Sequence, residues 1–309
     1  MNKDLLTLAA LSADDISLIL DTAAGLKDRL KKGELYQPLK GRTLAMIFEK
    51  SSTRTRVSFE AGMTQLGGHA MFLSRSDTQI GRGEEVRDTA RVLSRYVDAI
   101  MIRTFSQELV EELASYADIP VINGLTDLHH PCQVLADLLT VREHKGTLAG
   151  LKLAYIGDGN NMANSLIEGC VKAGMSFSIA CPAGYEPDEK ILNAAREYAD
   201  EAGAGARVEV VADPFEAVKG ADAVYTDVWA SMGQESEKAI REKAFKGYQV
   251  SAELVNAANR GAVVMHCLPA HRGEEITDEV MEGKNSVIFD QAENRLHAQK
   301  AVLELLINS

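Results

Sequence analysis

The sequence predicts an α/β protein made of two doubly wound parallel-sheet domains, with the active site in the interdomain cleft. Short apolar segments alternate with helix-like segments along nearly the whole chain, a pattern typical of βαβ units. Six of the apolar segments end in a cluster of polar, reactive residues. Because ligands in open parallel sheets bind beyond the carboxyl ends of the strands, these six clusters indicate an enzyme. At 309 residues the chain is also too long for one typical core, which favours two domains.

The first domain is expected to cover residues 1–145. It opens with a helix over 13–31, because Ser12 is a suitable N-cap and Gly33 follows the helix end. Strands and helices then alternate. The expected strands are 43–48, 69–74, 99–104 and 120–123, and the expected helices are 53–66, 84–97, 107–116 and 131–144.

The second domain is expected over residues 146–290, after a break at 145–150. Its expected strands are 151–156, 176–180, 207–211, 223–226, 263–267 and 287–289. The last segment, 291–308, predicts a helix with an apolar side formed by Leu296, Val302, Leu303 and Leu306. We expect residues 291–309 to pack back on the first domain.

The composition excludes several classes of protein. A net charge of −12 argues against a nucleic-acid partner, which needs a basic face. No apolar run approaches the roughly 20 residues that cross a membrane, and Met1–Leu11 does not resemble a signal peptide. Four cysteines in a chain of this length do not suggest a disulfide scaffold. We therefore expect a cytoplasmic protein without a membrane or nucleic-acid partner.

The first reactive cluster, Ser51–Arg56, predicts a phosphate site. Hydroxyls, helix N-terminal amides and a guanidinium together favour an anion. Between Lys50 and Arg103 nine Lys or Arg residues stand against six Asp or Glu, a local positive excess within an acidic chain. We assign Arg54 to the anion, because Arg56 lies on another side of the helix and can pair with Glu60. The alternative for this cluster is an ordinary helix cap that happens to carry charges.

The remaining clusters are open to more than one interpretation. Gly157–Asn161 lacks the third glycine of a dinucleotide fingerprint, and its asparagines suit either a ligand or a helix cap. His129–Gln133 and His266-Cys267 do not have the spacing of a structural zinc site. A Cys–His hydrolase is conceivable, but neighbours on a strand point to opposite faces. Asp227 precedes a glycine-containing loop, and it suits either an amine ligand or a turn cap.

Taken together, these motifs resemble those of the aspartate/ornithine carbamoyltransferase superfamily over essentially the whole chain. Phe48–Arg56 resembles its carbamoyl-phosphate signature, and His130-Pro131-Cys132-Gln133 is similar to its H-P-x-Q motif. Three further strings resemble the ornithine branch: Asp227 with Ser231-Met232-Gly233, His266-Cys267-Leu268-Pro269, and Gln79 with Arg82-Gly83-Glu84.

The resemblance implies a role for each candidate residue. The catalytic set would be Arg54, Arg103, His130, Asp227 and Cys267. Carbamoyl phosphate would contact Ser52, Thr53, Arg54, Thr55, Gln79, Arg103, His130, Gln133, Cys267, Leu268 and Arg295, with Gln79 reaching from this or a neighbouring subunit. Ornithine would contact Asn161, Asp227, Ser231 and Met232. No cofactor and no metal are implied.

The implied reaction moves the carbamoyl group of carbamoyl phosphate to the δ-amine of L-ornithine and gives citrulline and phosphate, in arginine biosynthesis or in the arginine deiminase pathway. The resemblance also implies a homotrimer. Three other functions remain open: a carbamoyltransferase for another amine, an NAD-dependent oxidoreductase, and a non-catalytic anion-binding module. The second would need an acid about 20 residues beyond the glycines, and Met175–Ala180 carries none.

Overall fold

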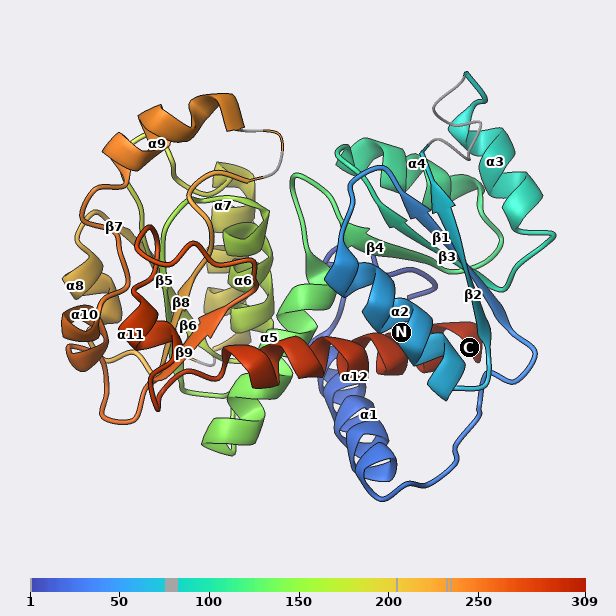
Figure 1. Ribbon diagram of the computed structural model, residues 1–309, viewed down its shortest axis with the longest axis horizontal. Coiled ribbons are helices and arrows are strands. Elements are labelled where there is room, and N and C mark those ends of the chain that lie inside the picture. Colours follow the sequence, from blue (N-terminus) through green and yellow to red (C-terminus); the bar gives the residue numbers. More distant parts are fainter. Residues whose placement is uncertain (1, 76–82, 204, 232, 234) are drawn as a thin grey trace. The chain divides into compact units, whose positions relative to one another are not determined.

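A computed structural model describes residues 2–75, 83–203, 205–231, 233 and 235–309. The chain divides into two compact units: the first unit is Met1–Ala136 with Asn294–Ser309, and the second unit is Asp137–Glu293. Each contains one parallel sheet (Figure 1). Within the described residues no helix is long and apolar enough to cross a bilayer.

The first unit holds a four-stranded sheet in the order β2-β1-β3-β4. Its strands are β1 (Thr43–Phe48), β2 (His69–Ser74), β3 (Ala99–Arg103) and β4 (Val121–Leu125), and all pairs are parallel. Its helices are α1 (Ala13–Lys31), α2 (Thr53–Gln65), α3 (Val86–Leu93), α4 (Gln107–Tyr116) and the first part of α5 (Pro131–Lys145).

The second unit holds a five-stranded parallel sheet in the order β7-β6-β5-β8-β9. Its strands are β5 (Lys152–Ile156), β6 (Ser176–Ala180), β7 (Val208–Val211), β8 (Ala223–Thr226) and β9 (Val263–His266). Its helices include α6 (Asn161–Lys172), α7 (Glu189–Ala202), α8 (Pro214–Val218), the 3-10 turn η2 (Glu235–Glu237), α9 (Lys238–Ala244), α10 (Ala252–Asn256), α11 (Asp278–Met281) and the start of α12 (Ile288–Ile307).

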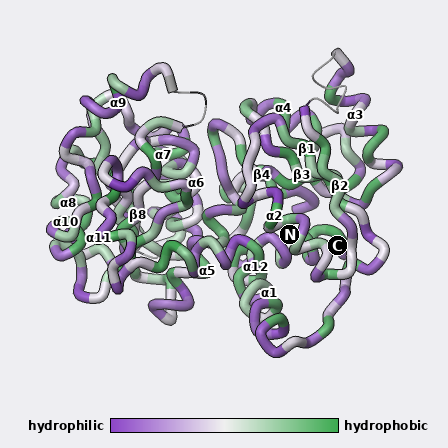
Figure 2. The backbone as a smooth tube through the Cα atoms, viewed as in Figure 1, coloured by the Kyte–Doolittle hydropathy of each residue, from purple (hydrophilic) through white to green (hydrophobic). Residues whose placement is uncertain are grey.

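The central strands contribute to the buried core of each unit, and the hydropathy colouring shows apolar stretches around β1 and β3 (Figure 2). In β1 and β3 every residue from Leu44 and Ala99 onward is buried, as expected for strands covered on both faces. The edge strand β2 alternates between exposed and half-buried residues instead. The strand ends that carry the candidate residues therefore rest on rigid, buried elements.

Two helices pass from one unit to the other. The division falls between Ala136 and Asp137 within α5, earlier than the expected boundary at 145, and between Glu293 and Asn294 within α12. The terminal part of α12 belongs to the first unit, where Lys27 donates to Asn294 and Tyr36 to Glu304 at 2.7 and 2.6 Å. The division by contacts therefore lies within a helix in both places.

One predicted strand, 287–289, was wrong. Only a single bridge forms there, between Val264 and Ser286, and Val287 adds one hydrogen bond to Val264 at 3.0 Å. The amide of Gln291 then donates to the carbonyl of Val287 at 2.8 Å, so the chain turns helical and α12 begins at Ile288. The short apolar run was ambiguous because periodicity cannot separate a buried strand from a buried helix turn.

Candidate active site

In the first unit, the predicted phosphate cluster lies at the point where the strand order reverses. The chain runs from β1 outward to β2 and then returns to β3 on the other side of β1. Phe48 pairs with Arg103 in register, and the amide of Glu49 donates to the carbonyl of Arg103 at 2.9 Å. The segment that follows β1 therefore starts beside Arg103. Ligands of open α/β sheets bind at such reversal points.

The start of α2 is built as an anion-binding helix end. Ser52 is its N-cap, with an extended backbone, and its Oγ accepts a hydrogen bond from the Thr55 amide at 3.2 Å. The hydroxyls of Ser52 and Thr55 are 3.1 Å apart, and Thr55 Oγ1 accepts from Arg295 Nη2 at 2.9 Å. The first turn of a helix has amides without partners within the helix, so this end attracts anions.

Three guanidinium groups act electrostatically on the His130 imidazole. The pKa of this buried imidazole lies well below its usual range, because burial disfavours its charged form and the positive charges of Arg295, Arg103 and Arg54 add to that effect. Since all three arginines act on one imidazole, their charges converge on one region. His130 is therefore a neutral ring among cations, and this region is suited to a dianion.

Gln133 lies in the first turn of α5, which begins directly after His130. Its amide donates to the His130 carbonyl at 3.2 Å. Both side chains are buried. Thr53, also in the predicted set, is the exposed first residue of α2.

Arg56 has the structural partner that its spacing predicted. Its Nε lies 2.9 Å from Glu60 Oε1, and its guanidinium stacks over the Phe72 ring with 3.8 Å to the centroid. Arg56 is exposed, whereas Arg54 is half-buried. Two arginines only two positions apart thus have different surroundings, which makes them a matched pair for mutation.

Lys50 was missed at the sequence level. It is buried, pairs with the exposed Asp127, and its ammonium lies 4.3 Å from the centroid of the Phe105 ring. The neighbouring Glu49 accepts a hydrogen bond from Thr104. These contacts tie the end of β1 to the loop after β3. The available signal was that Lys50 directly precedes the reactive cluster.

In the second unit, three candidate residues come together at the corresponding reversal of strand order, between β5 and β8. Ile156 pairs with Thr226, and Thr226 pairs with His266, so the three strands end in register. The residues that follow these ends are Gly157, Asp227 and Cys267. The strand register therefore brings a carboxylate and a thiol together.

Asp227 is the centre of this second cluster. Its Oδ1 accepts from Cys267 Sγ at 3.0 Å and from the Val228 amide at 2.8 Å, and its Oδ2 accepts from Asn160 Nδ2 at 3.0 Å. Asp227 is buried and Cys267 is half-buried. A carboxylate oriented in this way is suited to a cationic or hydrogen-bond-donating group such as an amine.

The thiol of Cys267 stays protonated. Burial raises its pKa well above the usual range, and the negative charge of Asp227 raises it further. A thiolate is the nucleophilic form of cysteine, so these surroundings disfavour covalent catalysis by Cys267. The imidazole of His266 hydrogen-bonds to Glu275 at 3.0 Å instead. The hydrolase alternative therefore loses its main support.

Asn160, which directly precedes the predicted Asn161, contacts the candidate carboxylate. Its Oδ1 also accepts from the Met162 and Ala163 amides at 2.9 and 3.3 Å, so Asn160 caps α6 while it holds Asp227. Asn161 is the half-buried first residue of that helix. The two neighbouring asparagines could not be separated by sequence, because only the register of the cap distinguishes them.

The glycines of this loop have a packing role. Gly157 has φ +148°, and a Cβ on Gly159 would lie 2.2 Å from the backbone nitrogen of Pro187. The Gly159 amide donates to the Tyr185 carbonyl at 2.8 Å. Close approach to the 185–187 segment explains this glycine without a dinucleotide.

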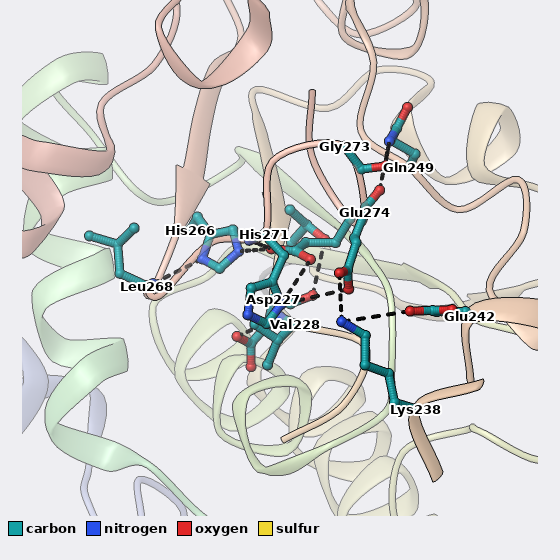
Figure 3. A network of polar contacts seen from close by, with 12 residues as sticks. Asp227, Val228, Lys238, Glu242, Gln249, His266, Leu268, His271, Gly273 and Glu274 are labelled. Atoms are coloured by element: carbon teal, nitrogen blue, oxygen red, sulfur yellow. Dashed lines mark hydrogen bonds and ion pairs between the residues drawn. The ribbon is translucent and has the colours of Figure 1, made fainter. Parts of the chain in front are cut away.

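The turn after β9 is held from inside. The Leu268 amide donates to His266 Nδ1 at 2.9 Å (Figure 3). His266 Nε2 lies 3.0 Å from Glu275 Oε1, and the side chains of His266 and Glu275 are both fully buried. Because Nδ1 accepts this hydrogen bond from the Leu268 amide, Nε2 carries the ring hydrogen and donates to the carboxylate. Leu268 has φ +60°, a strained conformation for a non-glycine residue.

Arg241 on α9 was also missed by sequence analysis. Its Nη1 donates to Asp158 Oδ2 at 2.7 Å and to the Trp229 carbonyl at 3.0 Å, while its Nε donates to Glu237 at 2.9 Å. Burial raises the pKa of Asp158 to about 6, although Arg241 opposes this effect. Arg241 thus connects Asp158 to both flanks of the segment that contains half-buried Ser231. Gln79 and Met232 lie outside the described residues.

Among the described residues, two groups of side chains have metal-ligating atoms within 4.8 Å of one another. One is the Asp227, His266 and Cys267 cluster. The other is His271, Glu274 and Glu275, in the loop that follows.

Comparisons with known proteins agree with this two-part arrangement. Residues 3–143 match the model of the carbamoyl-phosphate-binding domain of aspartate/ornithine carbamoyltransferase, and residues 149–306 match its aspartate/ornithine-binding domain. The ornithine carbamoyltransferase of Anoxybacillus flavithermus is 61% identical over 99% of this chain and 96% of its own length. That of Bacillus subtilis is 59% identical over 99% and 94%.

Solved structures give the same result. The ornithine carbamoyltransferase from Pyrococcus furiosus superposes with a TM-score of 0.96 at 55% identity, over 99% of this chain and 97% of that one. The enzyme from Gloeobacter violaceus gives 0.88 at 53% identity, over 99% of both chains. These likenesses extend over both units, so the chain belongs to the aspartate/ornithine carbamoyltransferase family.

Proposed function

We propose that this protein transfers the carbamoyl group of carbamoyl phosphate to the δ-amine of L-ornithine, giving L-citrulline and phosphate. The observation that carries the proposal is the chemical contrast of the two clusters: guanidiniums converge on His130, and the Asp227 carboxylate is oriented by Asn160 and Cys267. A dianionic donor and an amine acceptor require these two kinds of surroundings. The names of the most similar relatives support the same substrates.

In the first step, the first unit binds carbamoyl phosphate at the start of α2. Ser52, Thr53, Arg54, Thr55 and Arg103 hold the phosphate, Gln79 contributes a further contact, and His130, Gln133 and Arg295 hold the carbamoyl group. Cationic donors stabilise the charge that grows on the carbonyl oxygen and on the leaving phosphate. A neutral His130 can donate one hydrogen bond to the carbonyl without repelling the neighbouring arginines.

In the second step, ornithine presents a neutral amine. The amine nitrogen bonds to the carbamoyl carbon, the bond from that carbon to the phosphate oxygen breaks, and the nitrogen loses a proton. Asn161, Asp227, Ser231 and Met232 bind ornithine, Cys267 lies beside its amine, and the carbonyl of Leu268 is a further polar contact. Holding the reactants in attack geometry contributes much of the rate.

The amine has to be deprotonated before it reacts. With a pKa near that of lysine, about 10.4, roughly one molecule in a few thousand is neutral at pH 7. We expect kcat/KM for ornithine to rise with pH through the neutral-to-alkaline range, measured by initial rates. A flat profile between about pH 6 and 9 would argue against a free-amine nucleophile.

The experiment that tests the function is citrulline formation by the purified protein from carbamoyl phosphate and ornithine. Aspartate, putrescine and N-acetylornithine serve as competing acceptors, scored by their carbamoylated products. We expect turnover with ornithine and little with the others. Preferred turnover of another acceptor would point to a different carbamoyltransferase, and phosphate binding without turnover would point to an anion-binding module.

We further propose a homotrimer that acts in the cytoplasm, in arginine biosynthesis or in the deiminase pathway. Exposed apolar side chains in the first unit, among them Val57, Met71 and Tyr96, support association. The four cysteines are all unpaired with one another, which suits a reducing compartment. Sedimentation equilibrium tests the trimer.

A further inference from the structure

A second set of metal-ligating side chains lies in the loop after β9. His271 Nδ1 is 3.7 Å from Glu274 Oε2 and 3.9 Å from Glu275 Oε2. The three ligand atoms lie within 4.8 Å of one another. His271 and Glu274 are shown in Figure 3. His271 is exposed, Glu274 is half-buried, and Glu275 is fully buried.

Glu275 supplies an independent sign that something binds here. Its Oε1 accepts from His266 Nε2 at 3.0 Å and from the His271 amide at 2.6 Å. Its Oε2 is buried yet has no hydrogen-bond partner among the described residues. A buried carboxylate oxygen without a partner is costly, and nearly all such atoms in proteins are satisfied by a donor, a water or an ion. This oxygen lies 3.9 Å from His271 Nδ1, and Glu275 belongs to the cluster that contains His271 and Glu274.

We propose that His271, Glu274 and Glu275 bind a divalent transition-metal ion, and we expect this ion to be Zn²⁺. Imidazole nitrogen and carboxylate oxygen are both ligands that zinc accepts, and a water would take the fourth position. At bond lengths of about 2.0–2.2 Å, tetrahedral ligand atoms lie roughly 3.4 Å apart. The observed separations are slightly larger, so the accessible side chains of His271 and Glu274 close onto the ion.

The loop backbone already has the required turn. The Gly273 amide donates to the Ile276 carbonyl and the Glu274 amide to the His271 carbonyl, both at 2.9 Å. Gln249 Nε2 donates to the carbonyls of Gly273 and Glu274 at 2.8 and 2.7 Å. The backbone therefore holds all three ligands near one point before an ion arrives.

Lys238 places a positive charge beside the proposed metal site. Its ammonium lies 2.9 Å from Glu274 Oε1 and 3.6 Å from Glu242 Oε1. Glu274 Oε2 remains available for the metal, but the ammonium reduces the attraction of the site for a cation. Lys238→Ala should therefore bind the metal more tightly than the parent protein.

The test is a Co²⁺ titration of the full-length protein in a Cys267→Ser background, followed by visible absorption and calorimetry. This background removes the thiol of the other donor cluster, Asp227, His266 and Cys267. We expect one ion per chain and a spectrum without thiolate charge transfer. His271→Ala and Glu274→Gln should each weaken binding at least about tenfold, since loss of a ligand costs no less than loss of an outer partner.

Glu242→Gln is the matched control, because Glu242 also contacts Lys238 but lies outside the ligand set. It should not weaken Co²⁺ binding. In a second measurement, Zn²⁺ should raise the Tm of the Cys267→Ser protein but not of its His271→Ala derivative. Co²⁺ binding that is absent, or that survives both His271→Ala and Glu274→Gln, would overturn the proposal. Because the readout is binding, the test does not depend on the proposed carbamoyl transfer.

Discussion

The two candidate half-sites are built on the same architectural feature but with opposite chemistry. In the first unit the reversal between β1 and β3 brings arginines to a helix start, and in the second the reversal between β5 and β8 brings Asp227 beside Cys267. The two clusters carry opposite charge, and these charges shift the pKa of the neighbouring residue in opposite directions. Burial and then the guanidiniums keep His130 neutral, whereas burial and then the Asp227 carboxylate keep Cys267 protonated. One sheet topology can therefore bind either charge, depending on which residues follow the strands.

The largest effect is expected for Arg54→Ala. This change removes a half-buried guanidinium from the region around His130. We expect kcat/KM for carbamoyl phosphate to fall at least about 10³-fold, or ~4 kcal/mol, because charge-assisted contacts to a leaving phosphate are lost. Arg56→Ala is the control, since Arg56 pairs with Glu60 on the surface, and it should cost less than about tenfold. Equal losses in the two variants would remove the distinction between the two arginines.

Asp227→Asn should weaken the other half-site. The amide cannot attract a cationic amine, so we expect kcat/KM for ornithine to fall about 10²–10³-fold. A second readout is specific to the geometry: without the neighbouring charge, the pKa of Cys267 should fall, and alkylation of its thiol at fixed pH should become faster. Asp213→Asn, at a helix cap elsewhere in the second unit, is the control. Unchanged alkylation in Asp227→Asn would contradict the contact between Asp227 and Cys267.

The pH dependence of stability should have opposite signs in the two half-sites. Burial raises the pKa of Asp158 to about 6 in the folded protein, above the unfolded value near 3.8. The folded state therefore keeps the Asp158 proton to a higher pH than the unfolded state does. The free energy of unfolding then falls by up to about 3 kcal/mol as pH rises between these two values. Asp158→Asn cannot ionise, and its stability relative to the parent should increase from about pH 4 to pH 7 in thermal melts. A difference that does not change with pH would contradict the raised pKa.

For His130 the lowered pKa gives the reverse sign. The unfolded state takes up a proton below about pH 6.5 while the folded state does not, so stability is lost as pH falls. Inorganic phosphate should raise the pKa of His130 toward its usual value, because a dianion offsets the guanidiniums. Histidine titration by NMR, with and without phosphate, measures this smallest effect. No movement at saturating phosphate would show that the anion binds elsewhere.

The sequence predicted features that depend on local order and missed those that depend on packing. The helix over 13–31 and the strands over 43–48 and 69–74 have the expected bounds, since caps and turn glycines lie next to them in the chain. Asp227 and Cys267 were predicted to lie at strand ends, and the parallel register of β8 and β9 brings the two residues together. Arg241 and Glu275 were not found, since their partners lie 83 and nine positions away.

The most direct test of the division between a dianion site and an amine site is the Kd of inorganic phosphate, measured calorimetrically in the parent protein, Arg54→Ala and Asp227→Asn. We predict that phosphate binding is lost in Arg54→Ala and that its Kd stays within about twofold of the parent value in Asp227→Asn. Retained binding in Arg54→Ala, or loss in Asp227→Asn alone, would contradict it.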